Sequence, residues 1–130
     1  MLGPARRALV ERLSQFDSVV EIGIGQRVAV ARELAATEID VTAVDIVERD
    51  VPPGVTFVLD DITNPDETLY ADADALYACN FPPELHQPAL TLAESVDATL
   101  VFTTLGGDPP VVPVERNTVR GGTLYLARER

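Results

Sequence analysis

The sequence predicts an α/β protein in which a mostly parallel sheet is covered by helices on both faces. Helical and extended segments alternate along the chain, and parallel strands need the crossovers that such helices provide. The extended segments are short and apolar, as expected for strands buried on both faces. One of them ends in two glycines followed by a helical segment, and the next ends in an aspartate. Because ligands of such sheets bind at the carboxyl ends of the strands, these residues mark the expected site.

Length and composition favour one domain over residues 1–130. The chain has 130 residues, 46% of them hydrophobic, which is enough to form a core. No apolar run reaches the ~18 residues of a membrane span, and the amino terminus lacks an apolar stretch of signal-peptide length. We therefore expect a soluble, cytoplasmic protein with no membrane partner. Cys79 and His86 are the only residues of their kinds, so we expect no metal site. We assign Cys79 to the core as a small hydrophobe, with a nucleophile as the alternative, and His86 to the core or surface, with a general base as the alternative.

The chain is strongly acidic. Ten basic residues, all arginine, stand against 21 acidic ones, which gives a net charge of −11. The carboxylates are spread along the chain, a pattern that favours solubility in concentrated salt, where their mutual repulsion is screened. This predicts a halophilic, archaeal source, with an ordinary acidic mesophilic protein as the alternative. The sequence shows no basic stripe, so we do not expect a nucleic acid partner.

The first half of the chain is expected to form two helix–strand pairs. Apolar residues at helical spacing, with Pro4 suited to a first turn, predict a helix over about residues 4–15. The apolar run 18–22 predicts a strand that ends at a glycine. A second helix over residues 26–37 then leads to a β-branched strand over residues 39–45.

The second half is expected to contain five strands and one helix. The expected strands cover residues 55–59, 73–79, 98–104, 111–114 and 123–127. The helix covers residues 84–96 after a pair of prolines, and Pro88 within it is a residue able to shorten or kink it. Arg120-Gly121-Gly122 supplies a turn before the last strand.

The segment Glu21-Ile22-Gly23-Ile24-Gly25 carries the sharpest signal for function. Gly23 permits a tight turn from strand to helix, and Gly25 lets the backbone approach a ligand with no Cβ in the way. Asp45 ends the next strand, where a carboxylate can accept hydrogen bonds from ribose hydroxyls. The three residues predict a nucleoside site; the alternative is a tight turn with Asp45 capping a loop.

This segment resembles the first motif of class I S-adenosylmethionine-dependent methyltransferases, acid-x-Gly-x-Gly-x-Gly. Glu21, Gly23 and Gly25 match it, and Arg27 stands at the third glycine position. The resemblance implies S-adenosylmethionine as cofactor, with the Glu21 carboxylate under its cationic methionine end. Read as the dinucleotide fingerprint G-x-G-x-x-G, the segment has Val28 at the third glycine and gives Glu21 no role. Since a guanidinium would repel a sulfonium, either Arg27 points outward along its helix or the ligand is an anion.

Two later segments resemble further methyltransferase motifs. Asp60 and Asp61 follow the third strand, where the family carries an acid that accepts a hydrogen bond from the adenine amino group; a solvated loop pair is the alternative. Asn80 and Phe81 precede two prolines and are similar to the Asn/Asp-Pro-Pro-aromatic motif of amino-group methyltransferases, with the aromatic residue placed first. That similarity implies that Asn80 or Phe81 contacts substrate; the alternative is a rigid turn before the next helix.

The chain as a whole resembles the small archaeal uncharacterised protein family 0146. The likeness runs through the Glu21–Gly25 segment, residues 77–85, Leu105-Gly106-Gly107-Asp108, and the stretch from Glu115 to Tyr125. It implies a three-layer, Rossmann-like, methyltransferase-like fold and brings no activity with it.

Three functions stay open on the sequence alone. The first is transfer of a methyl group from S-adenosylmethionine to an unknown acceptor. The second is a non-catalytic nucleoside-binding or regulatory module, and the third is an NAD or phosphorylated-nucleotide binding protein with Arg27 near the phosphate. All three take a small-molecule nucleoside as partner. Because 130 residues leave only short loops for an acceptor, a homo-oligomer that completes the site also stays open.

Overall fold

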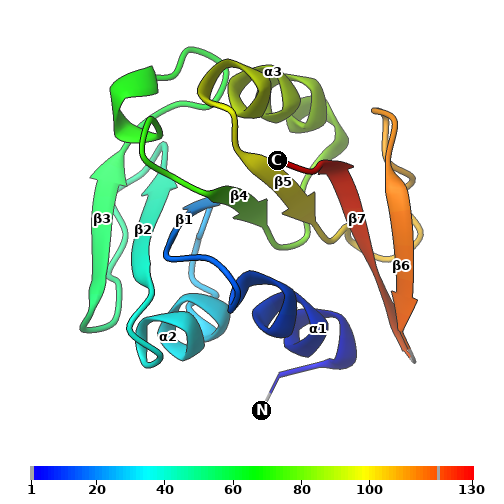
Figure 1. The fold of residues 1–130 in the computed structure, drawn as a ribbon, viewed down its shortest axis with the longest axis horizontal. Helices are drawn as coiled ribbons and strands as arrows, with labels where there is room; N and C mark the ends of the chain where they lie inside the picture. Colours follow the sequence, from blue (N-terminus) through cyan, green and yellow to red (C-terminus); the bar gives the residue numbers. More distant parts are fainter. Residues whose placement is uncertain (1, 120) are drawn as a thin grey trace.

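The computed structural model describes residues 2–119 and 121–130, which form three layers with a seven-stranded sheet in the middle (Figure 1). The strands are β1 (Ser18–Ile22), β2 (Asp40–Asp45), β3 (Val55–Leu59), β4 (Ala75–Ala78), β5 (Thr99–Phe102), β6 (Glu115–Val119) and β7 (Gly122–Arg128). Their order in the sheet is β3-β2-β1-β4-β5-β7-β6. The first five are parallel, and β7 runs antiparallel to both β5 and β6. This confirms the predicted mostly parallel, Rossmann-like sheet.

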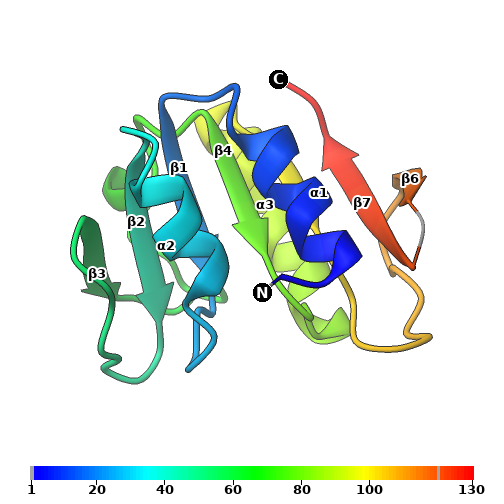
Figure 2. The same ribbon diagram turned by 90° about the horizontal axis from the view of Figure 1, so that it is seen from below.

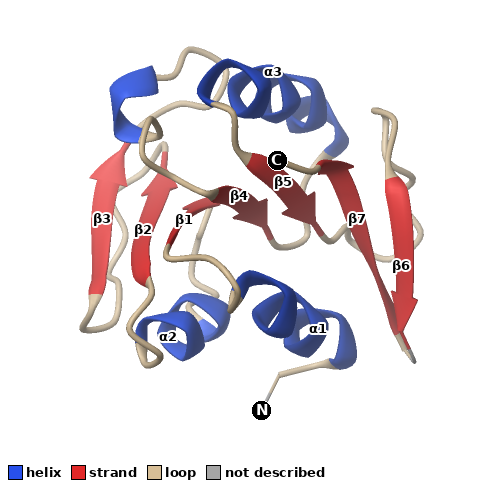
Figure 3. Ribbon diagram, viewed as in Figure 1, coloured by secondary structure: helices blue, strands red, loops and turns tan. Residues whose placement is uncertain are grey.

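The helices lie on both faces of the sheet, as predicted. Helices α1 (Pro4–Leu13) and α2 (Ala29–Ala35) cover one face, and α3 (His86–Val96) covers the other (Figures 1 and 2). Short 3-10 turns, η1 (Glu67–Leu69) and η2 (Pro83–Leu85), make up the remaining helical segments drawn in Figure 3. Pro88 lies in the first turn of α3, where its missing N–H leaves no helical hydrogen bond unmade. No described helix has the length and apolarity needed to span a membrane.

The core has two apolar layers, one on each face of the sheet. Leu9 and Leu13 of α1 pack with Leu34 of α2 on the first face, and all three are fully buried. Leu92 of α3 packs with Phe102 of β5 on the second face. The inner strands β1, β4 and β5 are buried along almost their whole length, because helices cover both of their sides. This double burial explains why the apolar runs of the sequence located them.

The predicted strand over residues 111–114 is wrong. Those residues form a loop, and the strand that pairs with β7 is β6, Glu115–Val119. Prolines before and within the loop remove donors that a strand would need. Because β6 is an exposed edge strand of mostly polar residues, it carries no apolar signal. The turn predicted at Arg120-Gly121-Gly122 begins at Arg120, which lies outside the described residues.

The β6–β7 hairpin lies close against the start of α1. A Cβ on Gly122 would meet the Ala5 Cβ at 2.6 Å, so only glycine fits there. Gly121 has a left-handed φ of +85°, and a Cβ on it would meet Pro4 at 3.0 Å. The amino-terminal turn of α1 and the start of β7 are therefore held side by side near the carboxyl end of β4 (Figure 2), and residues just after β5 border the same space.

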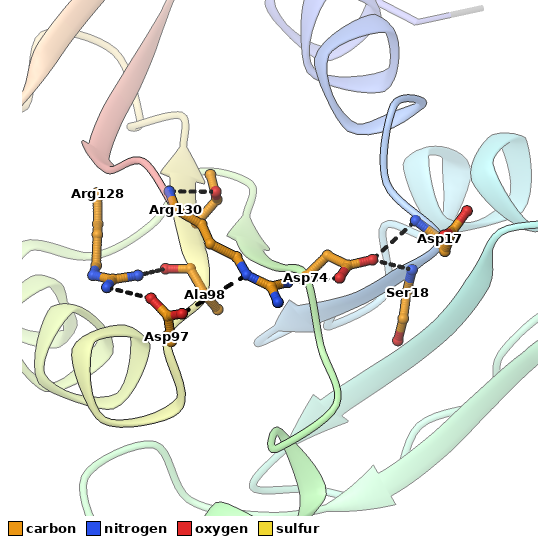
Figure 4. A network of polar contacts seen from close by, with 8 residues as sticks. Asp17, Ser18, Asp74, Asp97, Ala98, Arg128 and Arg130 are labelled. Carbon is orange, nitrogen blue, oxygen red and sulfur yellow. Dashed lines mark hydrogen bonds and ion pairs between the residues drawn. The ribbon is translucent and has the colours of Figure 1, made fainter.

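A polar network ties the chain's last residues to the amino ends of the parallel strands (Figure 4). Asp74 Oδ2 accepts hydrogen bonds from the backbone N–H groups of Asp17 and Ser18, at 3.0 and 3.1 Å, while Oδ1 pairs with Arg130 Nη1 at 2.7 Å. Arg128 Nη2 donates to Asp97 Oδ1, also at 2.7 Å. This network lies at the amino ends of the parallel strands, whereas Gly23 and Gly25 follow the carboxyl end of β1. It can therefore be altered without touching the expected site.

We expect Asp74→Asn to destabilise the protein by about 1–3 kcal/mol at pH 7, because it weakens a charge-assisted set of hydrogen bonds. Partial burial alone would raise the pKa of Asp74, but the donors of Asp17, Ser18 and Arg130 lower it overall. A lowered pKa stabilises the fold above the unfolded value near 3.9, and this contribution is lost as the pH falls below it. Urea unfolding at pH 7 and pH 3, at fixed salt, measures the difference.

The exposed Asp72→Asn variant is the matched control and should unfold like the wild-type protein at both pH values. An Asp74→Asn variant that is as stable as wild type at pH 7, or whose deficit is unchanged at pH 3, contradicts the role given to this carboxylate.

Candidate functional site

The turn after β1 leaves the backbone of Gly23 and Gly25 open. Both glycines have left-handed φ angles, +66° and +57°, which residues with side chains rarely adopt. The turn is fixed to β2, because the N–H groups of Gly23 and Ile24 both donate to the carbonyl oxygen of Val44, at 2.9 and 3.2 Å. Apart from the glycine itself and its two chain neighbours, no residue has a heavy atom within 4 Å of the position that a Cβ would take on either glycine. The backbone of this turn is therefore open to close approach, and the binding of a ligand there stays a prediction.

A cavity of about 410 Å³, which we call the glycine cavity, borders this turn. Its lining includes Gly23, Gly25, Arg27, Arg49, Cys79 and Asn80. The volume falls in the range of roughly 300–1,000 Å³ that small-molecule sites occupy. The cavity lies at the carboxyl ends of β1 and β4, which is where parallel sheets bind their ligands.

Asp45, the last residue of β2, faces the glycine turn, but its carboxylate already has protein donors. Oδ2 accepts hydrogen bonds from the Gly25 N–H at 2.9 Å and from Arg49 Nε at 3.3 Å. Oδ1 accepts one from the Val47 N–H at 3.2 Å and keeps one lone pair for a further donor. Asp45 therefore shapes the turn directly. A ribose hydroxyl would have to bind at Oδ1 or displace Arg49.

Glu21 is buried between β1 and β4 and does not line the glycine cavity. It is 1% exposed, and its Oε1 accepts a hydrogen bond from the Tyr77 hydroxyl at 2.7 Å. Burial raises the pKa of Glu21 to about 8, against the opposing effects of the Tyr77 hydrogen bond and the Arg6 charge. Near neutral pH the carboxyl group is therefore mostly protonated. The negative charge expected beneath a methionine end is largely absent at this pH.

The structure does not bring Asp60 and Asp61 to the glycine cavity. Asp60 Oδ2 accepts a hydrogen bond from the Tyr70 hydroxyl at 2.6 Å. Asp61 Oδ1 accepts from both the N–H and the hydroxyl of Thr63, at 2.9 and 2.7 Å, and these contacts lower the pKa of the Asp61 carboxyl. Both carboxylates hold their own loop in shape. A contact between either one and adenine stays a prediction.

Asn80 and Phe81 occupy different environments. Asn80 lines the glycine cavity with a left-handed φ of +51°, and its N–H donates to Thr103 Oγ1 at 2.9 Å. The next N–H, that of Phe81, donates to the Thr103 carbonyl at 2.8 Å. The Phe81 ring is buried against His86 and Phe102, with ring centroids 5.3 and 5.5 Å away. Of the two residues that the sequence singled out for substrate contact, Asn80 lies at the cavity and Phe81 lies in the core.

His86 supports the wall that carries Asn80. The imidazole is fully buried, with Nε2 at 3.0 Å from the Phe81 carbonyl oxygen and Nδ1 accepting a hydrogen bond from the Val111 N–H at 3.3 Å. Because Nδ1 is the acceptor, the Nε2–H tautomer satisfies both contacts. His86 is therefore a core residue, one of the two positions expected for it, and it joins the loop after β4 to the loop before β6.

Cys79 is half-buried in the wall of the glycine cavity. Burial and the nearby Glu21 carboxyl raise the pKa of the Cys79 thiol to about 12, against the smaller effects of Arg6 and Arg27. The sulfur is therefore a thiol at neutral pH and a poor nucleophile. Within the described part of the chain, no three His, Cys, Asp or Glu side chains gather as a metal ion would require.

Arg6 of α1 and Arg27 of the glycine turn converge on Asn80. With the Asn80 amide oriented so that Oδ1 faces the guanidinium groups, this oxygen accepts a hydrogen bond from Arg6 Nη2 at 3.3 Å and another from Arg27 Nη1. Arg27 lies before the start of α2 and reaches toward Asn80 instead of pointing outward along that helix. Sequence reasoning missed Arg6. Helical spacing could have found it, because Leu9 and Leu13 follow it by three and seven residues on the same inward face.

Solved structures share this architecture. An RNA methyltransferase from Salinibacter ruber in complex with S-adenosyl-L-homocysteine has a TM-score of 0.63 at 15% identity, over 98% of this chain and 95% of that one. A TehB-like SAM-dependent methyltransferase from Corynebacterium glutamicum has a TM-score of 0.62 at 16% identity, over 96% and 86% of the two chains. The protein therefore has the methyltransferase-like Rossmann fold that the sequence predicted.

Sequence similarity then gives the family. Residues 4–130 match Uncharacterised protein family (UPF0146), and the chain belongs to it. A UPF0146 protein from Halobacterium salinarum is 48% identical over 118 residues, which are 90% of this chain and 92% of the relative. Another, from Archaeoglobus fulgidus, is 36% identical over 110 residues, 85% of this chain and 83% of the relative. Both relatives are archaeal, and the family resemblance seen in the sequence is confirmed.

We expect Glu21→Gln to remove much of the pH dependence of stability. The pKa of this carboxyl is about 8 when folded against an ordinary 4.5, so the folded chain holds the proton more tightly. Its contribution to stability is full below pH 4.5 and is lost as the pH rises to 8. At roughly 1.4 kcal/mol per pKa unit, the loss in the wild-type protein amounts to about 5 kcal/mol. Denaturant unfolding between pH 5 and pH 9, at fixed salt, measures it.

Glutamine keeps a side-chain oxygen for the Tyr77 hydroxyl, so the variant should fold and show a flatter stability profile over this range. If the two proteins give parallel profiles, Glu21 is ionised in the folded state and the assignment of a neutral carboxyl is wrong.

Proposed function

We propose that this protein binds S-adenosylmethionine in the glycine cavity and transfers its methyl group to a separate acceptor. The observation that carries the proposal is the open backbone of Gly23 and Gly25, where no residue beyond the chain neighbours lies near the position of a Cβ, beside a cavity of about 410 Å³. The cavity lies at the carboxyl ends of the parallel strands in a methyltransferase-like fold. Structural neighbours that contain S-adenosyl-L-homocysteine support the choice of cofactor.

The residues present fit a nucleoside with an amino acid tail only in part. The glycine backbone offers room for close approach. Asp45 is buried behind the turn and does not line the glycine cavity, so its Oδ1 could accept from a ribose hydroxyl only if the turn opened toward it. Glu21 lies in β1 and links it to β4 through the hydrogen bond from the Tyr77 hydroxyl. Its carboxyl group carries little negative charge near neutral pH. We retain Asp60 and Asp61 as candidates for the adenine contact, on the strength of the sequence motif.

The cofactor supplies an activated methyl group when it is bound. In such a transfer an acceptor lone pair forms the bond to the methyl carbon while the carbon–sulfur bond breaks, and the electron pair of that bond stays on sulfur. An acceptor O–H or N–H gives up its proton to solvent. This chemistry asks the protein mainly to position two groups. Asn80, at the border of the glycine cavity, is the residue best placed to orient an acceptor.

A phosphorylated nucleotide is the second candidate ligand, and the two guanidinium groups at Asn80 favour it. A non-catalytic nucleoside-binding module would use the same cavity. Calorimetric titration with S-adenosylmethionine, S-adenosylhomocysteine, NAD and ATP separates these ligands. Incubation of cell extract with labelled S-adenosylmethionine then separates an enzyme from a binding module, because only an enzyme yields a methylated product.

We expect Gly25→Asn to weaken S-adenosylhomocysteine binding by roughly tenfold or more, because a side chain there would enter the glycine cavity. Asparagine tolerates a left-handed φ better than most residues, so the turn should keep its shape. Gly54→Asn is the matched control: Gly54 also has a positive φ, +87°, and lines none of the described cavities. Calorimetry on both variants measures the affinities. Equal affinity for the two variants would place the ligand elsewhere.

We also propose a cytoplasmic setting of high salt concentration. The net charge of −11 and the similarity to a Halobacterium salinarum protein support it. In about 1 M salt the Debye length is ~3 Å, so repulsion among spread carboxylates is largely screened. The Tm of thermal unfolding should therefore be well above its value in 0.1 M potassium chloride when the salt is raised to 3 M. Each kcal/mol gained raises Tm by roughly 4 °C for a domain of this size.

Sucrose at matched water activity is the control for solvent exclusion, since it does not screen charge and should give a smaller rise. A Tm that is the same in dilute and concentrated potassium chloride rules out a salt-adapted surface.

A further inference from the structure

A second cavity, of about 510 Å³, adjoins the glycine cavity, and we call it the arginine cavity. It lies between the first turn of α1, the end of β5 and the start of β7. Among its lining residues are Arg6, Arg27, Asn80, Thr103, Thr123 and Tyr125. Arg27, Asn80 and Leu105 line both cavities, so the two spaces meet at these side chains. An acceptor in the second cavity would lie next to a cofactor in the first.

The charge of the arginine cavity is opposite to that of the protein. Arg6 and Arg27 are the only charged residues among the described ones that line it. Of the other described arginines, Arg12, Arg49, Arg128 and Arg130 pair with carboxylates, whereas Arg7, Arg32 and Arg116 do not and line neither cavity. Within residues 2–119 and 121–130, neither Arg6 nor Arg27 has a carboxylate at ion-pair distance. In a chain with 21 acidic and ten basic residues, two such arginines at one cavity need an explanation.

The buried groups beside these arginines carry little negative charge. Glu21 is close enough for the Arg6 charge to lower its pKa, but burial still raises that pKa to about 8, so the carboxyl group is mostly neutral near pH 7. Cys79 stays a neutral thiol. Because both guanidinium groups donate to the same Asn80 oxygen, they also lie close enough to repel each other. An oxyanion between them would replace a neutral amide oxygen with a charged acceptor and relieve that repulsion.

The wall around the arginines offers further donors and a fixed shape. The hydroxyl-bearing residues Thr104, Thr123 and Tyr125 line the cavity, and Arg116 lies over the Tyr125 ring at 5.5 Å from its centroid. Thr103 holds Asn80 in place through the hydrogen bond from the Asn80 N–H. Hydroxyl donors beside two guanidinium groups match the needs of a carboxylate or a phosphate.

We propose that the arginine cavity is the acceptor subsite and that it takes an acidic small molecule, whose carboxylate or phosphate group is anchored between Arg6 and Arg27. This proposal rests on the proposed function, because it treats the glycine cavity as the cofactor site. The oxyanion is the anchor, and a different atom of the acceptor receives the methyl group at the side of Asn80 and Leu105.

Binding of inorganic phosphate, at pH 7 and ionic strength held constant with potassium chloride, tests the anchor. The readouts are calorimetry and the arginine Nε–H signals in ¹⁵N–¹H spectra. We expect saturable binding that Arg6→Gln and Arg27→Gln each weaken by roughly tenfold or more, as loss of a charge-assisted hydrogen bond implies. Arg7→Gln is the matched control: Arg7 is exposed, stands next to Arg6 on α1 and does not line the cavity, so its loss should leave affinity within about twofold.

S-adenosylhomocysteine binding, measured on the same proteins, separates the two cavities. We expect Arg6→Gln to leave its affinity unchanged, and phosphate to bind equally well to protein saturated with S-adenosylhomocysteine. Phosphate binding that is absent, or indifferent to both substitutions, overturns the anchor while the cofactor proposal stands. If Arg6→Gln weakens both ligands, or if they exclude each other, the arginines serve the cofactor and the acceptor subsite is wrong. Failure of the wild-type protein to bind S-adenosylhomocysteine overturns the proposed function, and the acceptor assignment with it, even if phosphate binds.

Since Arg27 is exposed in a loop, Arg27→Gln should fold even if the half-buried Arg6 proves necessary for stability. Thermal unfolding of each variant in the titration buffer shows which proteins are folded, and Arg27→Gln alone then decides whether phosphate needs the guanidinium pair.

Discussion

The hydrogen bonds that join the glycine turn to the end of β2 are the constraint on which the site depends. Gly23 and Gly25 both have φ angles that the rest of the chain mostly avoids, so the turn needs outside partners to hold it. It finds them in the Val44 carbonyl oxygen and the Asp45 carboxylate, which accept from consecutive parts of the turn. The parallel pairing of β1 with β2 places Ile22 opposite Val44, so these acceptors lie beside the turn that follows β1. Without these hydrogen bonds the turn would not be held in the conformation that leaves its backbone open.

The opposite wall is held by a different set of contacts. Thr103 receives two successive N–H groups, those of Asn80 and Phe81, and so fixes the loop after β4 to the end of β5. His86 fixes the same loop from beneath through the Phe81 carbonyl. This double support explains how Asn80 keeps a left-handed conformation, which costs a residue with a side chain of the order of 1–2 kcal/mol. Non-glycine residues held in this way are common where a side chain must be aimed.

What the sequence predicts well is what burial dictates. Strands β1, β4 and β5 stand out as apolar runs because helices cover both of their sides. The edge strand β3 is partly exposed and was located from its short extended run after the Pro-Pro-Gly turn. Asp45 was placed at the end of a strand, and it is the last residue of β2. The exposed edge strand β6 has no such pattern and was located wrongly. Long-range partners are also absent from a sequence pattern: nothing near Glu21 indicates that Tyr77, 56 residues later, lies against it. The inward position of Arg6 was available from helical spacing, but its convergence with Arg27 arises only from the packing of α1 beside the glycine turn.

The surface and the site of this protein make opposite electrostatic demands. A surface of spread carboxylates suits concentrated salt. The same salt shortens the range of electrostatic attraction between protein and ligand to a few ångströms. An anion therefore cannot be steered from a distance and must be held by contacts that begin at hydrogen-bond range. Two arginines in a partly enclosed cavity, beside a carboxyl group that burial keeps mostly neutral, provide such contacts without a large basic surface. For the acidic acceptor that we propose, the burial of Glu21 would serve binding as well as packing, because an ionised carboxylate there would offset the Arg6 charge that such a ligand needs.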